Sequence, residues 1–242
     1  INELQAADGI STFQDAQHAD HYIASFEYRW NAVDFRLETY LKKIDNPKTR
    51  FENLFDPYVL LPEIAADRIR VTATEARARG YEASVSYVPH DDFKAWLAYT
   101  RHLAEDRIGG VWRKRGWSQD HTVAGGLSWD VGPWSLSALA TWHSGWWTTG
   151  LPDQIAIDST PVITRNDLEL RDFFSLDARV SRSWTSGRYD ITFFAEVTNL
   201  TDRTNVGALE YDLGVADAVY ELGTEPESLI PRVPSIGLVV EF

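Results

Sequence analysis

The stretch YIASFEYRWNAVDFRLETYL, residues 22–41, alternates apolar and polar side chains on both sides of a short turn at residues 31–32. Its first half places Tyr22, Phe26 and Trp30 at even positions, with Glu27 and Arg29 between them. Because successive side chains of a strand point to opposite faces, this half has one apolar and one polar face. The second half repeats the pattern, so the stretch is predicted to form an antiparallel hairpin.

The same alternation recurs in segments of about ten residues, as expected for transmembrane strands with one face toward lipid. The further segments are residues 81–87, 93–99, 123–129, 134–142, 174–180, 189–197 and 235–242, which brings the total to about nine strands. Tight turns are predicted at residues 89–92, 130–133 and 185–188, and long connections at about 45–79, 105–119, 145–171 and 200–233. Short turns at one rim and long loops at the other are typical of outer-membrane barrels.

The predicted fold class is therefore all-β, an antiparallel up-and-down transmembrane β-barrel segment. Nine strands are an odd number and cannot close a bacterial barrel alone, so the barrel is predicted to be incomplete. Aromatic rings lie beside the tight turns, where a barrel carries an interfacial girdle. These rings are Trp30, Tyr87, Phe93, Trp129, Trp134, Trp184 and Tyr189. Soluble β-sandwiches also alternate, so a soluble aromatic-rich β domain that binds carbohydrate stays open as an alternative.

Composition narrows the function classes. The 242 residues carry a net charge of −13, which argues against a nucleic-acid partner because phosphates require a basic face. No stretch reaches the ~20 apolar residues of a membrane helix. The chain has no cysteine, which excludes disulfides and thiolate metal sites. It also has no methionine, even at position 1, so we expect it to be a portion of a longer protein.

Several stretches resemble the C-terminal part of a TonB-dependent outer-membrane receptor. They are RFENLFDP (50–57), PEIAADRIRVTATEARARGYEASVSY (62–87), WSQDHT (117–122), WHSGWWTT (142–149) and FAEVTNLTDRTN (194–205). The chain end, SIGLVVEF (235–242), resembles the terminal assembly signal of outer-membrane barrels, carried by Ser235, Gly237, Val240 and Phe242.

This resemblance implies a bacterial outer-membrane protein whose parent imports a scarce ligand such as a ferric siderophore. The implied partners are outer-membrane lipid and lipopolysaccharide, the barrel-assembly machinery and TonB, which acts through an N-terminal plug domain. Residues 1–242 are expected to be the C-terminal portion of the barrel without that plug. Import is therefore an expectation for the parent protein.

Candidate ligand-binding residues lie in two of the long connections. The stretch VWRKRGW (111–117) sets three cations between two indoles, an arrangement suited to an anionic ligand or to lipopolysaccharide phosphates. Trp146 and Trp147 follow a predicted strand and line either the ligand entrance or an upper aromatic girdle. The candidate residues are Trp112, Arg113, Lys114, Arg115, Trp117, Trp146 and Trp147.

No catalytic, metal or cofactor site is predicted. A hydrolase carried on the barrel is the remaining alternative, with the neighbouring pairs Asp120–His121, His143–Ser144 and His90–Asp91 as its candidates. Neighbouring residues of a strand point to opposite faces and cannot act together. Charged residues at the polar positions are expected to line the lumen as ion pairs. They are Glu27, Arg29, Arg36, Glu38, Glu82, Asp177, Arg179 and Glu196.

Overall fold

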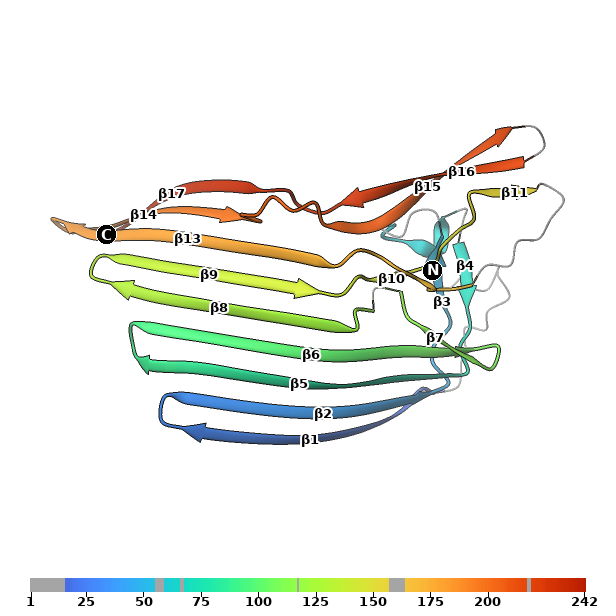
Figure 1. Cartoon of the computed structure of the whole chain (residues 1–242), viewed down its shortest axis with the longest axis horizontal. Helices are drawn as coiled ribbons and strands as arrows, with labels where there is room; N and C mark the ends of the chain where they lie inside the picture. Colours follow the sequence, from blue (N-terminus) through green and yellow to red (C-terminus); the bar gives the residue numbers. More distant parts are fainter. Residues whose placement is uncertain (1–15, 55–58, 66–67, 117, 157–163, 217–218) are drawn as a thin grey trace.

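One large antiparallel sheet dominates the computed structural model, which describes residues 16–54, 59–65, 68–116, 118–156, 164–216 and 219–242 (Figure 1). Nine of its strands follow one another in the order β1-β2-β5-β6-β8-β9-β13-β14-β17. They are β1 (His18–Trp30), β2 (Val33–Asp45), β5 (Glu75–His90), β6 (Phe93–Ile108), β8 (His121–Val131), β9 (Trp134–His143), β13 (Phe173–Ser186), β14 (Tyr189–Thr198) and β17 (Val233–Glu241). Within the described residues, no helix is long and apolar enough to cross a membrane.

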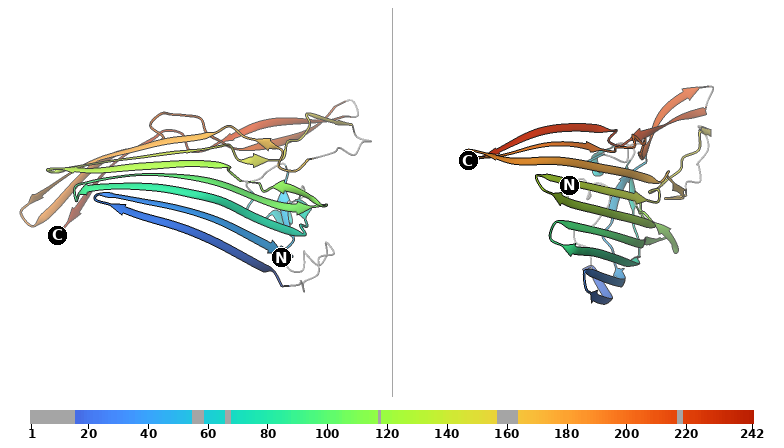
Figure 2. Two further views of the ribbon diagram at one scale, coloured as in Figure 1. Left: turned by 60° about the horizontal axis from the view of Figure 1, so that its bottom comes forward. Right: turned by 60° about the vertical axis from the view of Figure 1, so that its left-hand side comes forward.

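The sheet is curved and open (Figure 2). Its two edge strands, β1 and β17, each pair with a single neighbour in the described part of the chain. The predicted incomplete, up-and-down barrel segment of about nine strands is thereby confirmed. All four tight turns lie at the same end of the sheet, opposite the longer connections (Figure 1). Asn31, Gly132 and Gly187 have positive φ angles of 51°, 58° and 63° there, which two-residue hairpin turns require.

The cross-strand register collects most of the apolar residues of the nine strands on one face. One row of aligned residues runs from β1 to β13 through Phe26, Leu37, Ala83, Tyr99, Val123, Trp142 and Phe174. A second row, nearer the tight turns, aligns Val180 of β13 with Ala195 of β14 and Ile236 of β17. Large side chains of this face are open to the surroundings, with Phe26 57% and Leu238 61% exposed. We call the zone of this face that carries the apolar and aromatic residues the apolar band.

The opposite face of the same strands is mostly polar and carries ion pairs of the predicted kind, whereas Glu82 and Asp177 form none with other described residues. Arg36 contacts Glu38 at 2.7 Å and Glu27 at 3.6 Å, and Arg29 pairs with Asp34. A second pair joins the other half of the sheet, where Arg179 contacts Glu196 at 3.0 Å. One face suited to lipid and one suited to water is the alternation expected of a barrel wall.

The long connections differ from the prediction, because they fold into further strands instead of irregular loops. The strands are β3 (Arg50–Asn53), β4 (Arg68–Val71), β7 (Val111–Lys114), β10 (Trp147–Thr148), β11 (Gln154–Ala156), β12 (Leu168–Glu169), β15 (Val206–Ala216) and β16 (Val219–Ser228), with a 3-10 turn η1 (Pro62–Ile64). β6 also extends beyond its predicted end, and Gly109 and Gly110 turn it directly into β7 at φ values of 58° and 82°. The buried apolar residues, which include Phe51, Val71 and Tyr211, lie among these elements.

The VTNLTDRTN stretch closes the top of β14 with side-chain hydrogen bonds. Asn199, only 2% exposed, adopts a φ of 51°. Its side chain donates to the carbonyl of Arg203 at 2.9 Å and accepts from the N–H of Arg203 at 3.2 Å. Asn205 accepts from the N–H of Phe174 and donates to its carbonyl, both at 2.9 Å. These bonds satisfy buried backbone groups where the regular ladder ends.

Candidate ligand-binding site

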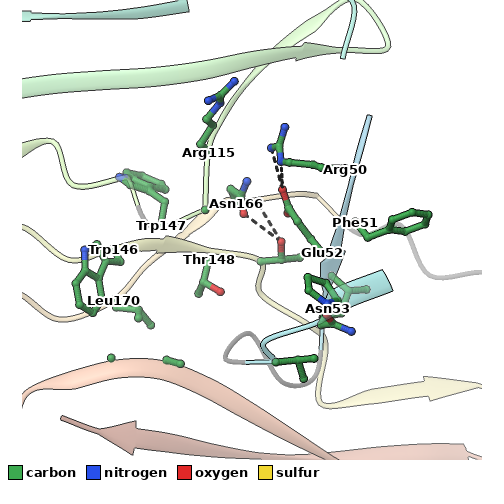
Figure 3. Close-up of a pocket in the computed structure, with 17 residues that line it drawn as sticks. Arg50, Phe51, Glu52, Asn53, Arg115, Trp146, Trp147, Thr148, Asn166 and Leu170 are labelled. Atoms are coloured by element: carbon green, nitrogen blue, oxygen red, sulfur yellow. Dashed lines mark hydrogen bonds and ion pairs between the residues drawn. The ribbon is translucent and has the colours of Figure 1, made fainter. Parts of the chain in front are cut away.

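A cavity of about 280 Å³ lies at the loop end of the sheet, between β3, the residues after β7, and β10. Arg50 and Glu52 of β3 lie on one side, and Trp146 and Trp147 lie on the other (Figure 3). The remaining lining residues include Arg115, Thr148, Thr149, Asn166 and Leu170. The cavity therefore combines charged groups with indole rings.

Five charged side chains form a continuous network beside this cavity. Asp106 is 1% exposed, and its carboxylate accepts from Arg50 at 2.7 Å and from Arg115 at 2.8 and 3.0 Å. Arg50 also donates to Glu52 at 2.9 Å, and Arg165 pairs with the same carboxylate. Three guanidinium groups therefore face two carboxylates, which leaves one positive charge in excess.

Burial disfavours the charged form of Arg165 in this network. Desolvation, together with repulsion from Arg50, lowers the pKa of Arg165 to about 10. The Nε atom of Arg165 is buried, and it has no hydrogen-bond partner within the part of the chain that the structure describes. An anion entering the cavity would meet an excess of cationic donors in a partly dry environment, where charge-assisted bonds are strong.

The two indoles of β10 and the preceding residue form the aromatic side of the cavity. Lys114 lies over the Trp147 ring at 3.5 Å and contacts Asp120 at 2.6 Å. The indole N–H of Trp146 donates to Gln119 at 3.0 Å. The Trp147 N–H is buried and lacks a hydrogen-bond partner among the described residues.

The structure separates the candidates of the 111–117 stretch. β7 pairs with β6, with Trp112 opposite Arg107 and Arg113 opposite Asp106, so neighbouring candidates lie on opposite faces. Trp112 stacks on Arg77, 4.0 Å from its guanidinium, and is not among the residues that line the cavity. Arg113 forms no ion pair with another described residue. Trp117 lies outside the described residues.

Five groups of this site were not among the predicted residues: Arg50, Glu52, Asp106, Arg165 and Asn166. Asn166 donates to the carbonyl of Lys114 at 2.6 Å, and its backbone N–H donates to Thr149 at 3.1 Å. Each of these contacts joins residues far apart in the chain, and no local pattern signals such contacts. The one available signal was a charged RFEN segment inside a connection that otherwise reads as loop.

The residues of the proposed assembly signal lie on the edge strand β17. A Cβ atom at Gly237 would lie 2.3 Å from Cζ of Phe194, so the Phe194 ring occupies the space that glycine leaves. Val240 belongs to the apolar band beside Ile191, and Ser235 is aligned with Glu196. Phe242 is 96% exposed and lies beyond the end of the strand.

The histidine pairs considered for hydrolysis form structural contacts. Ser144 Oγ accepts the backbone N–H groups of Asp120 and His121 at 2.9 and 3.1 Å. His143 Nδ1 lies 2.7 Å from the Ser144 carbonyl rather than from its hydroxyl. The His121 ring contacts the Tyr99 hydroxyl at 2.8 Å. Within the described ranges, no cluster of His, Asp and Glu side chains is arranged to hold a metal ion.

Comparison with solved structures identifies the fold. The chain resembles the ferric-catecholate import receptor Fiu of E. coli K12 at a TM-score of 0.53 and 16% identity, covering 93% of this chain and 27% of that one. The FrpB iron transporter of Neisseria meningitidis gives 0.58 and 13%, covering 95% and 32%. A mutant of the ferric enterobactin receptor PfeA of Pseudomonas aeruginosa gives 0.56 and 15%, covering 93% and 31%. No protein-family model and no curated protein sequence matches the chain.

The fold is thus that of outer-membrane receptor barrels, and the similar structures are TonB-dependent receptors, as the sequence resemblance indicated. The chain spans about a quarter to a third of the length of these proteins.

Proposed function

We propose that this chain is the C-terminal part of the barrel of a TonB-dependent receptor in a bacterial outer membrane. The apolar band is the single observation that carries the proposal. Large apolar side chains stay exposed across nine adjacent strands, while the opposite face is polar and ion-paired. A soluble domain rarely exposes a continuous apolar patch of this extent, whereas a barrel wall requires one.

The loop-end cavity is the proposed capture site for a small anionic ligand such as a ferric siderophore. Its excess guanidinium charge suits an anion, and the indoles of Trp146 and Trp147 suit flat, unsaturated groups. Capture at the loops would be followed by passage through the lumen of the parent protein, gated by a plug domain and driven through TonB. The similar structures include a ferric-catecholate import receptor and an iron transporter, which supports this ligand class.

Uptake of a radiolabelled ferric siderophore by cells that express the full-length parent protein tests this proposal. A Trp147→Ala variant should lower uptake and raise the ligand concentration needed for half-saturation, because it removes one aromatic wall of the cavity. Trp184→Ala, at the tight-turn end, is the matched control. Uptake should also stop in cells that lack TonB. Recovery of the protein as a soluble, carbohydrate-binding species would contradict the proposal.

The terminal strand would also present the assembly signal. Because Phe242 is almost fully exposed and beyond the strand, its ring contributes little packing within the described structure. Its deletion from the parent should leave unassisted folding in detergent nearly intact and strongly lower the amount assembled in cells. Normal outer-membrane levels after this deletion would exclude recognition of Phe242 by the barrel-assembly machinery.

A further inference from the structure

Three basic residues lie on the outer face of the sheet, directly above the apolar band. Lys43 of β2 and Arg79 of β5 each occupy the first outward-facing position after the last apolar or aromatic residue of their strand. Arg101 of β6 follows the last outward-facing aromatic residue of its strand, with Leu103 beyond it in line with Arg79. The outward-facing residues that precede the three cations, on the side of the tight turns, are Leu41, Tyr81 and Tyr99. The three cations therefore form a diagonal row at the loop-side boundary of the band, each offset from the next by two residues in the register.

The register makes these cations neighbours. Arg79 is aligned with Leu41, two residues from Lys43, and Arg101 is aligned with Tyr81, two residues from Arg79. Such diagonal neighbours on adjacent strands lie about 7–8 Å apart, within reach of long side chains. All three side chains are exposed. A single phosphorylated group could thus contact two or three of them.

These cations also lack the partners that nearby cations have. Closer to the loops, Arg77 contacts Glu105 at 2.7 Å and Arg107 contacts Glu75 at 2.6 Å. Lys43, Arg79 and Arg101 form no ion pair with any residue in the described ranges, although Asp20 is aligned with Lys43. Three unpaired like charges in adjacent positions repel one another unless an external anion neutralises them.

We propose that Lys43, Arg79 and Arg101 form an external binding site for the phosphate groups of lipid headgroups in the leaflet on the loop side. This inference rests on the proposed function, because only a membrane-embedded wall brings headgroups to this level. The rings of Tyr81 and Tyr99, 5.9 Å apart, lie directly below the cations, at the depth where aromatic residues meet the headgroup region. Phosphates bound here would neutralise the three positive charges that form no ion pair with other described residues.

The test compares two variants of the full-length parent protein with equal changes in charge. The site variant combines Lys43→Gln, Arg79→Gln and Arg101→Gln. The control combines Lys94→Gln, Arg182→Gln and Arg188→Gln, which lie toward the tight-turn end. Both are purified in detergent, and heat-modifiable gel mobility establishes that they are folded. Binding of bisphosphorylated lipid A and of its dephosphorylated form is then measured by native mass spectrometry. The single variant Arg101→Gln replaces the triple variant if the latter does not fold.

The wild-type and control proteins should prefer the phosphorylated lipid, and the site variant should lose most of that preference. Each basic side chain near an anionic membrane surface contributes a factor of roughly five in affinity, so the triple variant should bind at least tenfold more weakly. Equal affinities of the site and control variants would overturn the proposal. Displacement of the lipid by an equal concentration of inorganic phosphate would do the same, because the site would then bind free anions.

Membrane fractionation separates this inference from the proposed function. Recovery of wild-type protein in the soluble fraction would overturn the proposed function, and the lipid site with it. Normal recovery in the outer membrane with unchanged lipid binding by the site variant would overturn the lipid site alone.

Discussion

A substitution at Gly237 of the terminal strand distinguishes a packing role of this residue from its recognition by the barrel-assembly machinery. In Gly237→Ala, the added methyl group would lie 2.3 and 2.5 Å from Cζ and Cε1 of Phe194. The ring must therefore move. The Arg179 guanidinium stacks on this ring at 3.9 Å and also pairs with Glu196 at 3.0 Å, so the displacement disturbs a cluster on the polar face of the sheet.

Three effects determine the size of the change. Overpacking costs about 1–3 kcal/mol, at the lower end here because the obstacle is the tip of a side chain on an open face. Loss of the cation–π contact adds about 0.5–1 kcal/mol. Replacing glycine by alanine within a strand returns about 0.5–1 kcal/mol of conformational entropy. We expect a net destabilisation of about 1–2 kcal/mol.

A double-mutant cycle with Phe194→Leu isolates the steric contribution. Without the aromatic ring, Gly237→Ala should be neutral or slightly stabilising, which gives a coupling free energy of about 1–2 kcal/mol between the two positions. Urea unfolding of the four full-length proteins in detergent, followed by tryptophan fluorescence, measures this coupling. Outer-membrane levels of the same four proteins in cells provide the second readout.

A coupling near zero would refute the packing argument, since the methyl group would then not meet the ring. A large loss of assembly in cells that Phe194→Leu does not rescue would instead assign Gly237 to recognition by the assembly machinery.

Three other changes test separate parts of the structure. Asp106→Asn should destabilise the β3–β4 hairpin by about 2 kcal/mol. The cost is smaller than for a fully buried ion pair because the side chains of Arg50 and Arg115 are 34% and 37% exposed. Hydrogen exchange of residues 50–71 measures this loss of stability. Phe193→Arg, in the apolar band, should cost about 2–4 kcal/mol of folding free energy in bilayers, and Thr192→Arg on the polar face much less; equal costs would favour a soluble sheet. Hydrogen bonding from Trp142 lowers the pKa of Asp172. The ionised Asp172 carboxylate therefore stabilises the folded protein above about pH 4, and this stabilisation is lost as the pH falls through the lower pKa of the folded state. Trp142 fluorescence should follow that transition, and Asp172→Asn should abolish it.

The barrel wall could be predicted because its determinants are local. Each strand carries a period of two, and each tight turn carries residues such as Gly132 and Gly187 that tolerate positive φ. Register then follows from the turns and from the apolar face, because a slip of one residue would move every side chain to the wrong face.

The loop end could be predicted only in part, because its contacts are distant in sequence. Arg165 and Glu52 are 113 residues apart, and Arg50 and Asp106 are 56 apart. The basic cluster at residues 113–115 was visible in the sequence, but its division between two faces depends on β6 continuing through the Gly109–Gly110 turn into β7. For Trp146 and Trp147 the sequence allows either the ligand entrance or an upper aromatic girdle, and both residues line the cavity. That they bind ligand is a proposal.

The two boundaries of the apolar band give an independent argument for a tilted barrel wall. At the tight-turn rim, β1 ends at Trp30, whereas β8 extends four residues beyond Leu127, which the register places at the same height along the strands. At the loop rim, the last outward-facing apolar residue of β2 is Leu41, whereas β8 and β9 already reach theirs at Val123 and Trp142, which the register places four residues nearer the tight turns.

Both rims therefore slant in the same direction relative to the strand register, as they must when strands cross a membrane at about 40°. From Trp134 to Trp142, β9 covers about 27 Å along its axis at roughly 3.4 Å per residue, or about 21 Å along the membrane normal after the tilt. That height is close to the ~25 Å apolar band of outer-membrane barrels. A soluble sheet has no reason to keep its apolar zone at constant height between an aromatic rim and a cationic one.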